Sequence, residues 1–128
     1  MKTCGTLVRP EDVVPYIGRP LEVALAELAE RPADDPRIAE IIDAYRARWR
    51  GAVDVHGETL LLPGARALLR RLREAGLAVG VVTAKRHAEA DHLLVAMGIR
   101  DLVDVLVGTD EVPHGKPAPD SALLALKQ

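Results

Sequence analysis

The chain has 128 residues, 17 basic and 19 acidic side chains and a formal net charge of −2, so its length fits one domain, or one domain with a small appendage. With 48% hydrophobic and 28% charged residues, its composition is that of a folded chain and not of a disordered one. One tryptophan, two tyrosines, no phenylalanine and a charge near neutral all argue against a nucleic-acid partner.

Cysteine usage and hydropathy bear on the compartment. The single cysteine, Cys4, cannot form an internal disulfide, and we expect an inert thiol there. No charged and then apolar leader opens the chain, and no apolar run approaches the roughly 20 residues that span a bilayer. We therefore predict a cytoplasmic protein with no membrane partner.

The first 50 residues predict a pair of helices. Residues 1–18 are rich in proline and glycine and are expected to be irregular, apart from a short turn. After Pro20, apolar residues recur at helical spacing until Pro32, and a second helix is expected from about Pro36. Arginines cluster near residue 50, where the carboxyl end of this second helix is expected. Its apolar stripe consists of Ile38, Ile41, Ile42, Tyr45 and Trp49.

From residue 51 the pattern alternates between helix and strand. After a connector at residues 51–62, helices closed by glycine are predicted over about 63–76 and 88–97. Buried strands are predicted over residues 77–83 and 104–107. A proline-containing loop follows, and Asp120 and Ser121 are expected to cap a last helix. This alternation is typical of a parallel α/β layer.

Candidate chemistry lies where the two predicted strands end, because parallel α/β sheets bind ligands beyond the carboxyl ends of their strands. These loops contain Thr83, Ala84 and Lys85 after the first strand and Lys116 after the second. A lysine suits phosphate as a point charge, a threonine hydroxyl can donate, and the amides that open the next helix can bind an anion. Such residues also occur in loops without a ligand, so the residues alone leave both interpretations open.

Two other patterns are less favourable. Gly115 and Lys116 look like the end of a P-loop, but six residues separate Gly108 from Gly115, and Pro117 stands where a magnesium-binding Ser or Thr belongs. The histidines do not have zinc-site spacing, since His87 and His92 are five residues apart and the other two lie in predicted loops. We therefore expect solvated histidines.

Four stretches together resemble one family. LPGARALLRRLREAGLAVGVVTAK and GTDEVPHGKPAPDSALLAL are similar to the segments that carry the second and third motifs of haloacid dehalogenase superfamily hydrolases. IGRPLEVALAEL and DAYRARWR are similar to the small helical cap of the same family. Within the superfamily, the chain resembles the phosphoglycolate phosphatase and beta-phosphoglucomutase type, from about Pro10 onward.

The resemblance implies an α/β fold: a partial helical cap at residues 1–52 and an incomplete Rossmann-like core, with parallel strands and flanking helices, at residues 53–128. It also implies a magnesium-dependent phosphomonoesterase of small phosphorylated metabolites, in which an aspartate attacks phosphorus and forms an aspartyl phosphate. Thr83 and Lys116 are the implied catalytic residues: Thr83 hydrogen-bonds a phosphoryl oxygen and Lys116 balances negative charge. Thr83, Ala84 and Lys85 are the implied substrate-binding residues.

The chain departs from the family pattern at the nucleophile and at the metal ligands. Relatives carry a DxDGT motif and a later GDxxxD motif, and neither stands in these 128 residues. CGTL has Cys4 in place of the second aspartate, and DVHGETL, from Asp54, has His56 there. We therefore expect a chain truncated at both ends, with no metal ligands of its own and inactive alone.

Two alternatives remain. In the first, the chain is a noncatalytic binding module that pairs with a second copy or a complementing chain through residues 77–83. In the second, it is a gene fragment. The first is favoured by the composition of this strand, because it contains no charge or proline that would protect an open edge.

Overall fold

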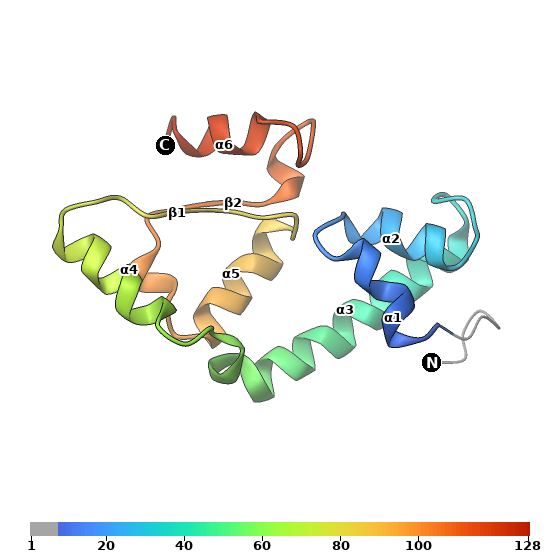
Figure 1. Ribbon diagram of the computed structural model, residues 1–128. Coiled ribbons are helices and arrows are strands. Elements are labelled where there is room, and N and C mark those ends of the chain that lie inside the picture. The colour runs from blue at the N-terminus through green and yellow to red at the C-terminus, as the bar shows by residue number, and fades with distance from the viewer. Residues whose placement is uncertain (1–7) are drawn as a thin grey trace. The chain divides into compact units, whose positions relative to one another are not determined.

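A computed structural model describes residues 8–128 (Figure 1). The chain forms two compact units, Met1–Arg50 and Gly51–Gln128. The division falls two residues before the predicted one, within a helix that continues across it. The roles of the units as cap and core remain a prediction.

The first unit is helical. It contains α1 (Pro10–Val13), α2 (Leu21–Leu28) and most of α3 (Pro36–His56), with a short 3-10 turn between α1 and α2. Ala26, Ile38 and Ile42 form its buried core. Arg46 of α3 pairs with Glu22 of α2 at 2.8 Å. The predicted pair of helices is confirmed.

The second helix is longer than predicted. α3 continues through residues 51–56, and the 3-10 helix η2 (Gly57–Leu60) follows, so the predicted connector is wrong over most of its length. Val53 is only 1% exposed, and burial of this side chain favours continuation of the helix. As a result, Arg46, Arg48 and Arg50 lie inside α3 and not in its last turn.

The second unit is built on a two-stranded parallel sheet. β1 (Gly80–Val82) pairs with β2 (Val105–Val107), with Gly80 opposite Val105. Helices α4 (Ala65–Glu74) and α5 (His87–Ala96) lie on one side of this sheet and α6 (Asp120–Ala125) on the other (Figure 1). The predicted α/β fold, parallel strands with flanking helices, is confirmed. Its core contains Val79, Ala90, Leu94, Ile99, Val103 and Leu106.

The first strand is shorter than predicted because the chain must first leave α4. Gly76 has φ +74°, and the Leu77 amide donates to the Leu72 carbonyl at 3.0 Å, the hydrogen bond of a Schellman motif. Leu77 is accordingly 55% exposed and lies outside the sheet. Hydrogen bonds to β2 begin at the Val79 carbonyl and end at the Thr83 amide.

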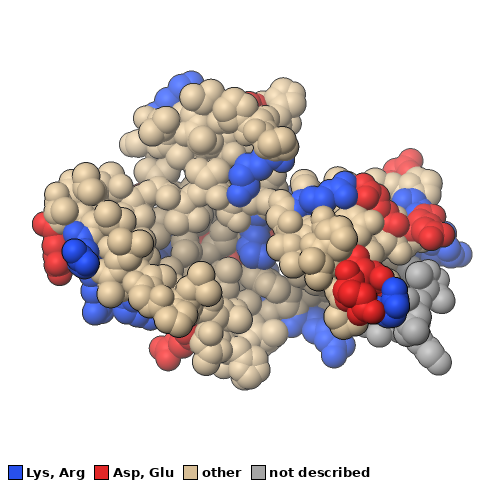
Figure 2. Space-filling model, in the orientation of Figure 1, with Lys and Arg blue, Asp and Glu red and all other residues tan. Residues whose placement is uncertain are grey.

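Side chains of both charges are scattered over the face in Figure 2, in keeping with the small net charge. Among residues 8–128, no helix combines the length and the apolar character needed to cross a membrane.

Asp104 fastens the amino ends of both strands. Its carboxylate accepts hydrogen bonds from the Val79 amide and the Arg73 guanidinium, each at 2.8 Å, while its own amide donates to the Val79 carbonyl at 2.9 Å. The Val79 hydrogen bond, assisted by Arg73 and opposed by desolvation, lowers the pKa of Asp104. Deprotonated Asp104 therefore stabilises the sheet.

This arrangement predicts a loss of stability in acid. Since the pKa of Asp104 is lower in the folded chain, its stabilisation is present above the unfolded pKa, about 3.9, and disappears as the pH falls through the folded pKa. Urea unfolding of the chain and of Asp104→Asn at neutral and acidic pH tests this. The parent chain should have the higher free energy of unfolding at neutral pH, and this difference from Asp104→Asn should become smaller in acid. A difference that does not change with pH would contradict the stabilising role of the Asp104 carboxylate.

Candidate functional site at the carboxyl ends of the strands

The structure brings Thr83 and Lys116 to the same end of the sheet. The Thr83 amide donates to the Val107 carbonyl at 3.0 Å, so Thr83 lies where both strands end. Lys116, 33 residues later, donates from Nζ to the Val82 carbonyl at 3.4 Å. The two residues that the sequence singles out therefore both lie at the carboxyl end of β1, Thr83 directly after the strand and Lys116 with its ammonium group beside the last residue of the strand.

A tight turn follows Thr83. The Lys85 amide donates to Thr83 Oγ1 at 3.2 Å, so the hydroxyl accepts this hydrogen bond and keeps its own proton for another acceptor. The Lys85 carbonyl accepts from the Thr109 amide at 2.9 Å, which links the turn to the loop after β2. Thr83, Ala84 and Lys85 are all partly buried. Ala84 therefore lies between two residues that hydrogen bonds hold in place.

The first amide of α5 is already occupied. We expected the amides that open this helix to be available to an anion, but the His87 amide donates to Asp110 Oδ1 at 2.7 Å. Asp110 Oδ2 also lies 4.0 Å from Nε of Arg86. A carboxylate of the protein thus takes the helix position that a bound anion would favour.

Glu111 makes a second connection in the same region. Its Oε2 accepts hydrogen bonds from the Gly108 amide at 2.6 Å and lies 2.7 Å from His87 Nδ1. The Gly108 hydrogen bond, with a smaller contribution from His87, lowers the pKa of Glu111 against the effect of desolvation. Sequence reasoning missed this residue, although the spacing G-x-x-E at residues 108–111 is one form of the capping signal at a helix start.

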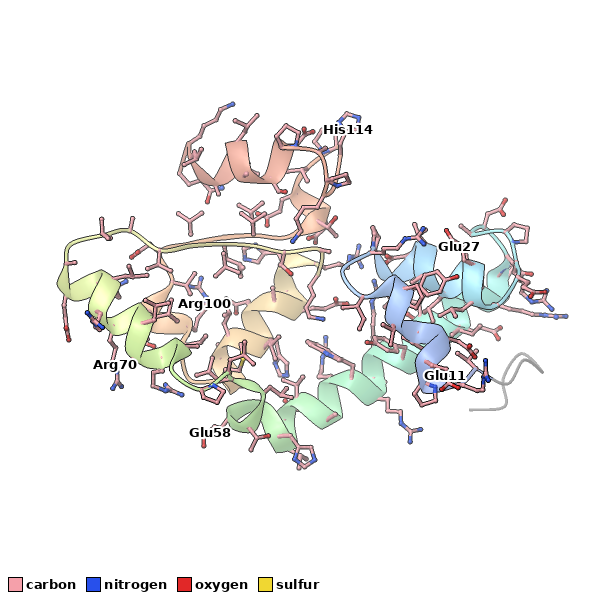
Figure 3. All side chains as sticks on the ribbon, in the orientation of Figure 1. Glu11, Glu27, Glu58, Arg70, Arg100 and His114 are labelled. Carbon is pink, nitrogen blue, oxygen red and sulfur yellow. The ribbon has the colours of Figure 1, made fainter. Side chains whose placement is uncertain are left out.

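The four histidines are exposed or partly exposed, in keeping with the prediction of solvated histidines, and three of them also pair with carboxylates. Imidazole nitrogens lie 2.7–2.9 Å from carboxylate oxygens in the pairs His87–Glu111, His92–Asp54 and His114–Asp120. His114, labelled in Figure 3, lies in the loop before α6, and its partner is Asp120. The expectation that Asp120 caps α6 with its side chain is therefore wrong.

The motif DVHGETL does not form a strand end. Its first three residues, Asp54, Val55 and His56, lie in α3, and the other four form η2. The Asp54 carboxylate pairs with His92 at 2.8 Å. Its geometry therefore does not resemble a nucleophile at the carboxyl end of a strand, and the other candidate position, Cys4, lies outside the described residues.

A metal site is not formed by the part of the chain that the structure describes. Within residues 8–128, no three His, Cys, Asp or Glu side chains come together as ligands for a metal ion. The two acids of the loop after β2 hydrogen-bond backbone amides, Asp110 that of His87 and Glu111 that of Gly108. These residues do not fit a magnesium centre, so magnesium enters no step derived from this geometry.

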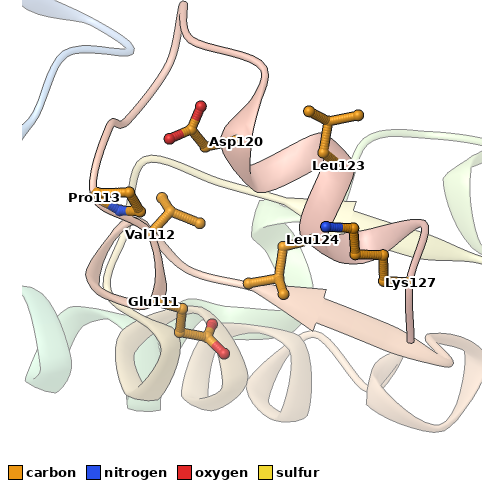
Figure 4. A pocket seen from close by; sticks show the side chains of 7 residues that line it. All are labelled: Glu111, Val112, Pro113, Asp120, Leu123, Leu124 and Lys127. Atoms are coloured by element: carbon orange, nitrogen blue, oxygen red, sulfur yellow. The ribbon is translucent and has the colours of Figure 1, made fainter.

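A separate shallow groove lies beside α6 (Figure 4). It has a volume of about 290 Å³ and neither Thr83 nor Lys116 lines it. Glu111 lines the groove and also pairs with His87, so it borders both regions. The remaining lining residues are Val112, Pro113, Asp120, Leu123, Leu124 and Lys127.

Comparison with known proteins identifies the family. The family model for haloacid dehalogenase-like hydrolases matches residues 1–128, the full length of the sequence. The chain therefore belongs to this family of hydrolases, as the sequence motifs implied.

Two curated relatives and one solved structure give the scale of the similarity. The chain is 35% identical to "Probable phosphatase IndB" of Dickeya dadantii, over 88% of this chain and 49% of that protein. It is 34% identical to phosphoglycolate phosphatase of Cereibacter sphaeroides, over 84% of this chain and 50% of that enzyme. The chain thus spans about half the length of the curated relatives it matches.

The structural comparison concerns the fold alone. A crystal structure of a haloacid dehalogenase-like hydrolase from Bacteroides fragilis has a TM-score of 0.71 at 22% identity. The match covers 95% of this chain and 57% of that one. The two-stranded parallel sheet and its helices therefore correspond to part of a larger α/β fold.

Proposed function

We propose that this chain carries the phosphate-binding part of a phosphatase site for small phosphorylated metabolites. The observation that carries the proposal is the meeting of Lys116 with the end of β1, where its Nζ lies 3.4 Å from the Val82 carbonyl, one residue before Thr83. The names of the relatives, a phosphatase and a phosphoglycolate phosphatase, support this class of substrate. We also propose that this chain is cytoplasmic.

Each residue has a specific role in this proposal. The Thr83 hydroxyl, which already accepts the Lys85 amide, donates its proton to a phosphoryl oxygen. The Lys116 ammonium group has three donors, and the two that do not point to the Val82 carbonyl offset negative charge on the phosphoryl group. The Ala84 amide, and Lys85 beside it, complete the substrate-binding turn. Such positioning and charge stabilisation account for most catalysis of phosphoryl transfer.

Phosphate binding should depend on Lys116. We expect the 128-residue chain to bind inorganic phosphate with a Kd of about 1 mM, equivalent to about −4 kcal/mol. Lys116→Ala should weaken binding about tenfold, because charged hydrogen bonds contribute about 1.5–3 kcal/mol. Amide chemical shifts followed during a phosphate titration measure both values. Lys127→Ala, which removes the same charge in the groove beside α6, is the matched control and should bind as the parent chain does.

The same titration can refute the proposal. Shifts should concentrate at residues 83–85 and 115–116, and no shift at either segment would remove these residues from the site. Equal weakening by Lys116→Ala and Lys127→Ala would mean that general charge attraction, and not a site, holds the phosphate.

Turnover should be absent from the 128-residue chain. Asp110 and Glu111 are committed to backbone amides, and Asp54 is paired with His92 in α3, so none is presented as a nucleophile. Assays with p-nitrophenyl phosphate and phosphoglycolate, in the presence of Mg²⁺, test this. Turnover abolished by Asp54→Asn would restore DVHGETL as the nucleophile motif, and turnover that survives this change would indicate a nucleophile elsewhere.

A second candidate function is association through β1. Within the described residues β1 has one partner strand, β2, and Gly80 on it is exposed. Residues 77–83 contain no charge and no proline, which are the features that protect sheet edges. We propose that a second copy or a complementing strand pairs there.

A further inference from the structure

We propose that Asp110 and Glu111 are positioning residues that fasten the turn after β1 to the loop after β2 and so set the separation of Thr83 and Lys116. This inference rests on the proposed phosphate site. Neither acid contacts phosphate in this proposal, and each acts through hydrogen bonds to the backbone. Asp110 and Glu111 lie two and three residues after Gly108, where the chain has just left β2.

Three hydrogen bonds join residues 85–87 to residues 109–111. The Thr109 amide donates to the Lys85 carbonyl at 2.9 Å, and the His87 amide donates to Asp110 Oδ1 at 2.7 Å. The third joins His87 Nδ1 to Glu111 Oε2 at 2.7 Å. Lys85 and His87 thus bind the three consecutive residues Thr109, Asp110 and Glu111. The hydrogen bond between the Thr83 amide and the Val107 carbonyl precedes these three at the ends of the strands.

Glu111 also fixes the shape of its own loop. The Oε2 atom that meets His87 accepts the Gly108 amide at 2.6 Å, which bends the chain back directly after β2. Hydrogen bonds from an amide to a carboxylate are shorter and stronger than those between neutral groups. Glu111 therefore holds both the start of its own loop and the first residue of α5.

The hydrogen bonds between the two loops affect Thr83 and Lys116 because both residues lie close to the residues that form these bonds. Thr83 lies two residues before Lys85, and the Lys85 amide holds the Thr83 hydroxyl. On the other loop, Gly115 lies close enough to Thr109 that a Cβ there would be 3.0 Å from Thr109 Oγ1. Lys116 is the next residue, so the position of Thr109 influences both parts of the site.

Asp104 provides a control of the same chemistry at the opposite end of the strands. Asp104 and Glu111 each accept one backbone amide and face one basic side chain, Arg73 and His87 respectively. Both have a lowered pKa caused first by the amide hydrogen bond. Loss of Asp104 should reduce the stability of the sheet without altering the loops at its carboxyl end.

The experiment compares the full chain with Glu111→Ala, Glu111→Gln and Asp104→Ala. Amide hydrogen exchange is measured at Lys85 and Thr109, and inorganic phosphate is titrated while amide shifts are followed. Exchange at the two amides should accelerate about tenfold in Glu111→Ala, and the phosphate Kd should rise about tenfold, the effect of losing one charged hydrogen bond. Glu111→Gln keeps a side-chain oxygen for the Gly108 amide and should restore most of both properties.

Each outcome decides the inference. The inference is wrong if amide exchange at Lys85 and Thr109 is unchanged in Glu111→Ala. It is also wrong if the phosphate Kd rises as much in Asp104→Ala as in Glu111→Ala, because a general loss of stability then explains the weaker binding. Should Glu111→Ala fail to fold, Glu111→Asp gives the same comparison, since its carboxylate is one methylene shorter. If the parent chain binds no phosphate, the proposed function fails, and the exchange rates alone decide whether Glu111 holds the loops together.

Discussion

Replacing Gly108 with alanine should disrupt the two loops more severely than removal of any one hydrogen bond between them. Gly108 is buried, and a Cβ at this position would overlap the backbone nitrogen of His87 and lie 2.7 Å from both His87 Cα and Asp110 Oδ1. Because backbone atoms at the start of α5 cannot rotate away, the loops must separate. We expect a loss of about 1–3 kcal/mol in the free energy of unfolding, the usual range for overpacking.

Urea unfolding followed by circular dichroism measures this loss, and Gly80→Ala is its matched control. Gly80 lies in β1, where an added Cβ would meet no atom within 4 Å, so Gly80→Ala should leave stability unchanged or raise it by about 0.5–1 kcal/mol. Gly108→Ala should also abolish the shifts that phosphate causes at residues 83–85. Equal stability of the two variants would contradict the close approach of Gly108 to His87.

The sequence predicts the parts of this fold that local signals determine. Glycine after an apolar helical stripe predicted the ends of α4 and α5, and Gly76 and Gly98 both have positive φ there. Alternation of helix and apolar strand predicted the parallel sheet and, through the rule for its carboxyl ends, Thr83 and Lys116. These predictions needed only neighbouring residues and a general rule of topology.

The sequence did not predict features that depend on distant contacts. The composition of residues 51–62 is that of a connector, but burial of Val53 keeps residues 51–56 in α3. Asp110 and Glu111 resemble ordinary loop acids until the fold brings them to His87, which lies 23 and 24 residues away in the chain. The pair between His92 and Asp54 has the same cause, because Asp54 comes from α3 and His92 from α5.

Association of the chain should follow from the exposed edge of β1. Two-stranded sheets are marginally stable in water, and unpaired strand edges recruit further strands. We therefore expect the sedimentation coefficient of the 128-residue chain to rise with concentration.

A charge at Gly80 should suppress this association. Because no atom lies within 4 Å of a Cβ at this position, Gly80→Lys adds a charge to the edge strand without disturbing the core. Val81 packs against the core, so a charge at that position would also affect folding. Gly80→Ala, which adds the methyl group alone, should associate as the parent chain does. A parent chain that stays monomeric at high concentration, with slow amide exchange throughout residues 77–83, would mean that this chain covers its own edge. Dissociation by Gly80→Lys alone would instead identify β1 as the strand through which copies meet, because the two variants differ at that edge only in the charged side chain.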